Sequence, residues 1–194
     1  MCVDNNTAFR IRETAHDLIA ARGYFGFSYA DIADAVGIRK ASIHHHFPSK
    51  VDLVVATLRE YRAKLVEAAG GLDQNVADPM QRIEMYVQHW AECVKSNNRP
   101  ICIAALLSAE LPALPEEIQI EVRLHFQFLV SWVRATFNEG ADRGSVRLRD
   151  GAETEAQAFV ALVHGAMISA RALGSSEIFL SITRSALERL QVSD

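Results

Sequence analysis

The stretch "SYADIADAVGIRKASIHHHFPSK", residues 28–50, contains two short helical patterns separated by a glycine. Ser28, with Asp31 three residues later, has the spacing of a capping box, which opens a helix. Gly37 suits the left-handed backbone conformation that commonly ends a helix. A second helix follows at once and ends at Pro48, because the residue before a proline avoids helical geometry. A helix, a tight turn and a second helix form the layout that places the second helix in the major groove of DNA.

Three consecutive histidines lie on the second of these helices, at residues 44–46. A helix turns by about 100° per residue, so the three imidazoles fan out and do not converge on one tetrahedral metal ion. Histidine pairs that bind zinc on a helix are spaced four residues apart, and no order of Ser, His and Asp suggests a catalytic triad. We therefore expect no catalytic site, no metal and no cofactor.

The remaining side chains of the second helix separate into an apolar face and a polar face. Ile43 and Phe47 lie one turn apart, and we expect them to anchor the helix beside Ile38. The opposite side carries small and hydrogen-bonding residues flanked by cations, which suit base edges and phosphates. The residue chemistry alone leaves two interpretations open, a DNA-reading surface and a solvated helix face with a chance run of histidine.

Charge is unevenly distributed along the 194 residues, although the net charge is only −4. Residues 38–50 contain three basic residues, three histidines and no acid, whereas residues 51–194 carry 14 Lys and Arg against 19 Asp and Glu. The three cysteines, an odd number without metal-ligand spacing, indicate a reducing compartment. The N-terminus has no signal-peptide core, and no stretch approaches the length of a membrane span. We therefore expect a soluble cytoplasmic protein without a membrane partner.

Helical spacing continues through the rest of the chain, and no convincing strand alternation occurs. Helices are expected from Ser49, from Pro79, and at about 102–110, 115–138, 152–172 and 176–191, with breaks at 70–79 and 96–100. The fold class is thus all-α, with about nine helices. The helix at 115–138 has one apolar face through Ile118, Val122, Phe126, Leu129, Val133 and Phe137. A second face holds Ile120, Leu124, Phe128 and Trp132, so we interpret this helix as the spine of the body.

Cys102 supports a separate hypothesis. It is expected in the first turn of a short helix, close to Arg99, where unpaired N–H groups and a cation would stabilise a thiolate. Such a thiol would sense electrophiles or oxidants. The alternative is a buried cysteine that acts as a small hydrophobic residue.

Residues 12–58, "RETAHDLIAARGYFGFSYADIADAVGIRKASIHHHFPSKVDLVVATL", resemble the N-terminal domain of the TetR/AcrR family of transcriptional repressors. The shared features are the end of the first helix at "ARGYF", the "SYADIA" start of the second, the turn glycine and the terminal "HFPSK". The resemblance implies a helix-turn-helix DNA-binding domain over 1–52 and a helical body over 53–194 that dimerises and binds an effector. DNA contacts are expected from Ser28, Tyr29, Ala30, Arg39, Lys40, Ala41, Ser42, His44, His45 and Lys50.

Two positions depart from the family pattern. Arg39 stands where the family commonly has Ser, a better N-cap, so the first turn of the recognition helix is expected to fray without DNA. His44 stands where Tyr is usual, and an imidazole gains charge near neutral pH. We therefore expect phosphate contacts that depend on pH.

Beyond residue 58 the candidates come from residue type and helical position. Effector-binding candidates, each of which also suits a plain core residue, are Tyr61, Tyr86, His89, Trp90, Cys93, Cys102, Leu106, Phe126 and His164. The resemblance implies that the last two helices of two subunits pack together, and the apolar residues on them are the dimer-interface candidates, which alternatively cap a monomer core: Phe159, Val163, Ala166, Met167, Ala170, Ile178, Ile182 and Ala186. The sequence thus predicts a non-enzymatic homodimeric repressor that binds a palindromic operator and is released by a small, mostly apolar effector. The alternative is a thiol sensor acting through Cys102 on the same scaffold.

Overall fold

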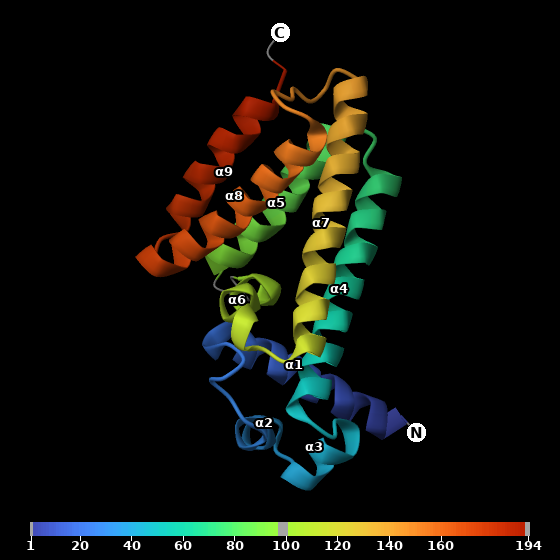
Figure 1. The fold of residues 1–194 in the computed structure, drawn as a ribbon, viewed down its shortest axis with the longest axis vertical. Coiled ribbons are helices and arrows are strands. Elements are labelled where there is room, and N and C mark those ends of the chain that lie inside the picture. Colours follow the sequence, from blue (N-terminus) through green and yellow to red (C-terminus); the bar gives the residue numbers. More distant parts are fainter. Residues whose placement is uncertain (1, 97–100, 193–194) are drawn as a thin grey trace. The chain divides into compact units, whose positions relative to one another are not determined.

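A computed structural model describes residues 2–96 and 101–192. Within these residues the chain forms nine α-helices and one 3₁₀ turn, with an isolated bridge between Val146 and Gln191 and no strand. This confirms the all-α class. Figure 1 labels the helices, which are α1 (Cys2–Arg22), α2 (Tyr29–Val36), α3 (Lys40–His46), α4 (Lys50–Asn75), α5 (Pro79–Ser96), α6 (Ile103–Glu110), α7 (Glu116–Asp142), α8 (Ala152–Leu173) and α9 (Ser176–Leu190). The 3₁₀ turn η1 (Leu111–Ala113) follows α6.

The chain divides into two compact units. The head unit contains Met1–Lys64 and Cys102–His125, and the bundle unit contains Leu65–Ile101 and Phe126–Asp194. The helices α4 and α7 each contribute residues to both units. The expected domain boundary between residues 52 and 53 does not coincide with a boundary of these compact units, and it stays a prediction.

The caps of α2 confirm the reading of its sequence. The Ser28 hydroxyl accepts the N–H of Ala30 at 3.2 Å, and the Asp31 carboxylate accepts the N–H of Ser28 at 2.8 Å. Gly37 ends the helix with a φ of 74°, and Gly23 ends α1 with a φ of 71°. Both glycines adopt the left-handed conformation that disfavours residues with a Cβ atom.

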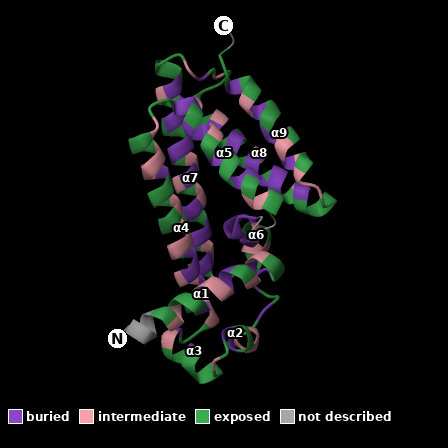
Figure 2. Ribbon diagram, turned by 180° about the vertical axis from the view of Figure 1, so that it is seen from behind, coloured by how far each residue is buried: buried purple, intermediate pink, exposed green. Residues whose placement is uncertain are grey.

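The core of the head unit forms because α1, α2 and α3 each turn one apolar face inward. The buried side chains on these helices and on the start of α4 are Ile11, Ala15, Ile19, Ile32, Val36, Ile43, Leu53 and Leu58. Burial of such side chains supplies the main driving force for folding. It leaves the opposite faces of α2 and α3 exposed, as Figure 2 shows.

In the bundle unit, α8 and α9 lie side by side, joined at Gly174, whose φ is 64° (Figure 1). One face of α8 is buried against its neighbours through Phe159, Val160, Val163, Ala166, Met167 and Ala170. The ring of Phe159 meets Phe137 of α7 edge-on at 5.6 Å. By length and composition α8 could cross a membrane, but 44% of its most apolar window is buried inside the structure, as in the core helix of a globular protein.

Two expectations were wrong. The helix α4 continues through Gly70 and Gly71 to Asn75 instead of breaking at residue 70. Tertiary contacts hold this last part, since Asp73 accepts a hydrogen bond from Trp132 Nε1 at 3.1 Å. Such contacts outweigh the low helix propensity of glycine.

The second apolar face of α7 is also only partly covered. Trp132 is buried, but Ile120 and Leu124 are 44% and 39% exposed. The first face is buried except at Phe126, which is half-buried. The first face of α7 is therefore packed into the core, whereas the second face is exposed to solvent over the residues nearest the N-terminus of the helix.

Candidate nucleic-acid interface

The α3 helix presents a polar surface to solvent. Its exposed residues, with the residue that precedes the helix, are Arg39, Lys40, Ala41, Ser42, His44 and His45 (Figure 2). Four of these carry a cationic or imidazole group, and the two small residues sit between them. The arrangement combines groups that reach phosphate oxygens with a stretch where the helix backbone can approach base edges.

Buried contacts hold α3 in place beneath this surface. Ile43 is fully buried and Phe47 is 7% exposed, which confirms both as the anchors expected from the sequence. The Tyr29 hydroxyl donates to the Phe47 carbonyl at 2.9 Å and ties α2 to the end of α3. Burial, with the nearby charge of Asp52, raises the pKa of Tyr29 to about 12, so the phenol stays protonated and remains a donor.

The first turn of α3 has no side-chain cap. Arg39 occupies the N-cap position, and its side chain makes no capping hydrogen bond. The missing cap agrees with the reading of Arg39 as a weak start signal, although fraying of this turn stays a prediction.

His44 is oriented by its neighbours. Its Nδ1 lies 3.1 Å from the Pro48 carbonyl oxygen, and its ring meets the Tyr29 ring edge-on at 4.8 Å. Because a carbonyl can only accept, Nδ1 carries the proton and Nε2 is the atom left for a ligand. A neutral His44 thus offers an acceptor at Nε2, and only the protonated ring donates there to a phosphate.

Lys50 does not join this surface. Its ammonium group turns inward and donates to the carbonyls of Tyr24 and Phe27. It also lies 4.1 Å from the centre of the Phe27 ring, and burial lowers its pKa. A phosphate contact would require Lys50 to leave both carbonyls. In this structure Lys50 holds the loop after α1, and its expected DNA contact stays a prediction.

The start of α2 contributes the other expected contacts. Ser28 is exposed, while Tyr29 and Ala30 are half-buried. Hydrogen bonds from Ser28 lower the pKa of the exposed Asp31, which also pairs with Arg22 at 3.1 Å. The Ser28 hydroxyl is already used in the capping box, so any DNA contact from it competes with the cap.

The effector candidates fall into two groups, one in each unit. In the bundle unit Tyr86, Trp90 and His164 are buried, Cys93 and Phe126 are half-buried, and His89 is exposed. Phe126 meets the His164 ring edge-on at 5.2 Å.

In the head unit, Tyr61 and Cys102 meet at His125. The Tyr61 ring stacks on the buried His125 ring at 5.3 Å, and Cys102 Sγ lies 3.6 Å from His125 Nε2. Leu106 is half-buried on α6. His125 was missed because its one sequence signal, a histidine within an apolar helix, does not reveal its partners. Cys102 lies just before α6 rather than in its first turn, and Arg99 lies outside the described residues.

The dimer candidates point mostly into the chain's own core. Six of them are buried within the bundle unit: Phe159, Val163, Ala166, Met167, Ala170 and Ala186. Ile178 and Ile182 are half-buried. The six buried residues are part of the core of the bundle unit, and the role of all eight in a dimer interface stays a prediction.

Across residues 2–96 and 101–192, no group of three or more His, Cys, Asp or Glu side chains is placed to hold a metal ion. The histidines of α3 spread around the helix, since His44 and His45 are exposed and His46 is half-buried.

Comparison with known proteins points to one family. Residues 11–57 match the model of the bacterial regulatory proteins of the tetR family. The chain is 27% identical over 143 residues to the transcriptional repressor KstR2 of Mycobacterium tuberculosis, covering 74% of this chain and 70% of that protein. It is 29% identical over 146 residues to the transcriptional regulator CymR of Pseudomonas putida, covering 70% and 71%.

A solved structure extends the likeness to the whole chain. The crystal structure of a TetR-family transcriptional regulator from Agrobacterium tumefaciens is 43% identical, with a TM-score of 0.95. The match covers 97% of this chain and 100% of that one. At this identity and coverage, the chain belongs to the TetR family of DNA-binding transcriptional regulators.

Proposed function

We propose that this regulator is a repressor that binds a palindromic operator as a homodimer in the cytoplasm and leaves it when a small, mostly apolar effector binds. The observation that carries the proposal is the exposed polar face of α3, held on buried Ile43 and Phe47 and following the capped helix α2. The repressor sense is supported by relatives such as KstR2, whose name describes a transcriptional repressor.

In this proposal α3 enters the major groove. Ala41 and Ser42 approach base edges, Arg39 and Lys40 bind phosphates at the start of the helix, and the imidazoles of His44 and His45 bind phosphates farther along. Phosphate contacts supply much of the affinity and make it depend on salt. The charge of these few residues matters most because residues 51–194 carry more acids than bases.

The second copy packs against the outer face of α8 and α9. Exposed or half-buried small and apolar residues repeat there with helical spacing, namely Ala158, Ala161, Leu162, Gly165, Ile168, Ser169 and Ala172 on α8 and Ile178, Ser181, Ile182 and Ser185 on α9. Small residues allow two helices to approach closely. A two-fold dimer of this kind presents two α3 helices to half-sites about 34–36 Å apart.

The effector is proposed to bind among the aromatic residues of the bundle unit, which include Tyr86, Trp90, Phe126 and His164. Three of these four side chains are large aromatic rings, so a small, mostly apolar molecule is favoured over a multiply charged one. Phe126 also lines a surface cavity of about 360 Å³, whose other residues are mostly polar: Gln127, Val130, Ser131, Arg134, Glu153 and Gln157. Effector binding releases DNA only if the effector prefers a state of the dimer that the operator disfavours.

The test is operator binding by matched variants. We expect Lys40→Ala and Ser42→Ala to weaken retention of DNA from upstream of the protein's own coding sequence by about tenfold or more. Lys95→Ala removes an exposed cation from α5 and is expected to change nothing. Equal losses in the α3 and α5 variants would contradict the proposed interface.

A second candidate trigger is covalent modification of Cys102, because its Sγ lies 3.6 Å from His125 Nε2. An imidazole at this distance can accept the thiol proton and make the thiolate available. The thiol is fully buried in this state, so reaction requires local opening. A variant that keeps only Cys102 should react with iodoacetamide and lose DNA binding, and Cys102→Ser should abolish the response. Unreactive Cys102, or an unchanged response in Cys102→Ser, rules out the trigger.

A further inference from the structure

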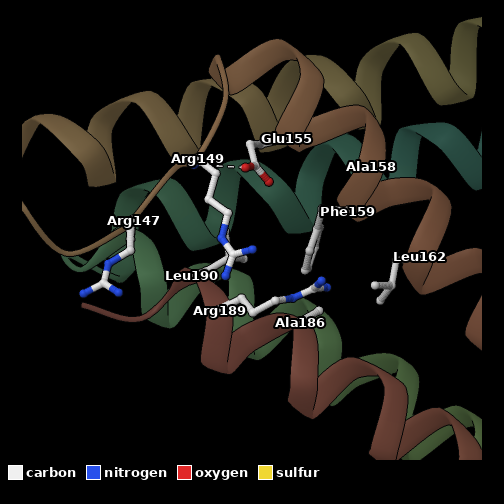
Figure 3. Close-up of a pocket in the computed structure, with 9 residues that line it drawn as sticks. All are labelled: Arg147, Arg149, Glu155, Ala158, Phe159, Leu162, Ala186, Arg189 and Leu190. Atoms are coloured by element: carbon white, nitrogen blue, oxygen red, sulfur yellow. Dashed lines mark hydrogen bonds between the residues drawn. The ribbon is translucent and has the colours of Figure 1, made fainter. Parts of the chain in front are cut away.

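A cavity of about 130 Å³ lies in the bundle unit, bounded by the segment between α7 and α8 and by the helices α8 and α9 (Figure 3). It is separate from the effector site proposed above, whose nine candidate residues do not line it. The wall combines four apolar residues, three arginines and one acid: Phe159, Leu162, Ala186, Leu190, Arg147, Arg149, Arg189 and Glu155, with Ala158 at its edge.

Two guanidinium groups, both on exposed residues, border this cavity. In Figure 3 the side chains of Arg149 and Arg189 reach from opposite walls into the space beside Phe159 and Leu190, while Arg147 is directed away. Two like charges in one partly enclosed space repel each other. An anion between them converts this repulsion into two charge-assisted hydrogen-bonding interactions.

The protein's own acid does not fill that role. Glu155 Oε1 accepts the backbone N–H groups of Arg149 and Asp150 at 3.1 and 3.3 Å. Among residues 2–96 and 101–192, no carboxylate oxygen lies within 4.0 Å of the guanidinium nitrogens of Arg147, Arg149 or Arg189. The positive charge of the wall is therefore not neutralised by the described residues.

The floor of the cavity is apolar and firmly packed. Phe159, Ala186 and Leu190 are 5%, 4% and 6% exposed, so these side chains are part of the core. A bare inorganic anion would leave this floor uncovered, whereas an apolar group attached to the anion would bury it. The volume suits one ring, since an apolar cavity of about 150 Å³ holds a benzene molecule.

We propose that this cavity binds a small organic monoanion, a carboxylate carried by a single ring or a short branched chain. The carboxylate lies between Arg149 and Arg189, which match its two oxygens, and the apolar part lies on Phe159 and Leu190. The proposal does not depend on operator binding or on the residues assigned to the effector.

The test is calorimetric titration of the full chain with three probes. Benzoate has both required parts, benzamide has the same shape without the charge, and inorganic sulfate has charge without the ring. We expect saturable benzoate binding, with benzamide and sulfate at least about tenfold weaker, because loss of a charged hydrogen-bonding partner costs about this factor. Arg149→Ala and Arg189→Ala should each weaken benzoate binding by about tenfold, whereas Arg184→Ala, an exposed cation elsewhere on α9, should not.

Filling the cavity tests its location without removing charge. Ala158→Phe should abolish benzoate binding while circular dichroism shows an unchanged helix content. Because Ala158 also lies on the proposed dimer face, sedimentation should show the same oligomeric state as for the unmodified protein. Benzoate affinity that is unchanged in the arginine variants, or equal to that of sulfate, would overturn the proposal. So would the absence of benzoate binding together with dissociation of a dimer in Arg149→Ala, which would mean that a carboxylate of a second copy fills the cavity.

Discussion

Gly23 and Gly37 have the same backbone conformation but different surroundings. Their φ angles are 71° and 74°. A Cβ atom on Gly23 would lie 2.0 Å from Glu110 Oε1, whereas one on Gly37 would meet nothing within 4 Å. The other oxygen of Glu110 accepts the N–H of Tyr24 at 2.8 Å. Gly23 is therefore required both for its left-handed backbone and for the close approach of this carboxylate.

Alanine at the two positions should separate these effects. Gly37→Ala is expected to lower the free energy of unfolding by about 1–2 kcal/mol, the cost of a left-handed residue with a Cβ atom. Gly23→Ala should cost about 1–3 kcal/mol more because of the collision with Glu110. Urea unfolding measures both, and adding Glu110→Ala to Gly23→Ala should recover part of the difference. Equal losses at the two glycines would mean that Glu110 moves away without cost.

The imidazoles of α3 predict a pH dependence of DNA binding. A neutral His44 with its proton on Nδ1 can only accept at Nε2, so it donates from Nε2 to a phosphate only when that nitrogen also carries a proton. Operator affinity at fixed ionic strength should therefore rise by about threefold to tenfold between about pH 8 and about pH 6. Fluorescence anisotropy with a labelled operator measures it. The double variant His44→Gln, His45→Gln should have a flat profile, and a flat profile in the unmodified protein would exclude both phosphate contacts.

At the scale of elements, α4 and α7 are joined within the head unit by a buried carboxylate. Glu121 is 3% exposed and accepts hydrogen bonds from Arg59 at 2.7 Å and Arg62 at 2.6 Å. Burial alone would raise the pKa of Glu121, but the bonds and charges of the two arginines outweigh it and hold this pKa below its usual value. The folded state therefore binds this proton more weakly than the unfolded chain does.

This ion pair should stabilise the protein above a pH of about 4.3, the pKa of a glutamate in the unfolded chain. Its contribution is lost as the pH falls through the lower folded-state pKa. Glu121→Gln should lower the free energy of unfolding at neutral pH by about 1–2 kcal/mol, because a neutral amide accepts weaker hydrogen bonds from the two arginines, which keep part of their contact with water. The control, Glu153→Gln, breaks the exposed pair with Arg134 and should cost under about 1 kcal/mol. Equal costs would contradict the burial argument.

The second half of α4 contains Gly70 and Gly71, which destabilise the helix only because a glycine backbone loses more conformational entropy on folding than other residues do. A Cβ atom on Gly70 or Gly71 would meet nothing within 4 Å. Gly70→Ala and Gly71→Ala should therefore each raise the free energy of unfolding by about 0.8–1.0 kcal/mol. Gly140→Ala in α7 is the contrast, because its Cβ would lie 2.3 Å from Val146 Cγ2 and should destabilise the protein. Thermal unfolding compares the three variants. A lower stability of Gly71→Ala would contradict the expectation, because it would mean that the added methyl group collides with another group.

At the scale of the whole molecule, the proposed dimer depends on the outer face of α8. Gly165 is exposed at the middle of this face. Gly165→Arg should convert the dimer to a monomer in sedimentation experiments, because a long cation prevents close approach of two helices. Gln88→Arg adds the same side chain to an exposed position on α5 and should leave the dimer intact. A dimer that survives Gly165→Arg would place the interface elsewhere.

Short sequence patterns were sufficient to predict the helix ends that are marked by capping residues. Ser28 with Asp31, Gly37, Pro79 and Gly174 each marked a helix end that the structure contains, because capping depends on neighbouring residues alone. The anchors Ile43 and Phe47 followed from helical spacing in the same way. The family resemblance rested on these features.

Features that need a partner from a distant segment were not predictable. The last part of α4 is held by the hydrogen bond from Trp132 to Asp73. The ammonium group of Lys50 turns inward because it donates to two carbonyls of the preceding loop. The Cys102 thiol lies beside His125, which is distant in the sequence. The two faces of α8 have similar periodicity, so only packing shows which one is buried. Helix ends and apolar faces depend on residues that are close in the sequence. The direction of a charged or buried side chain depends on its contacts with residues that are distant in the sequence and become neighbours only in the folded chain.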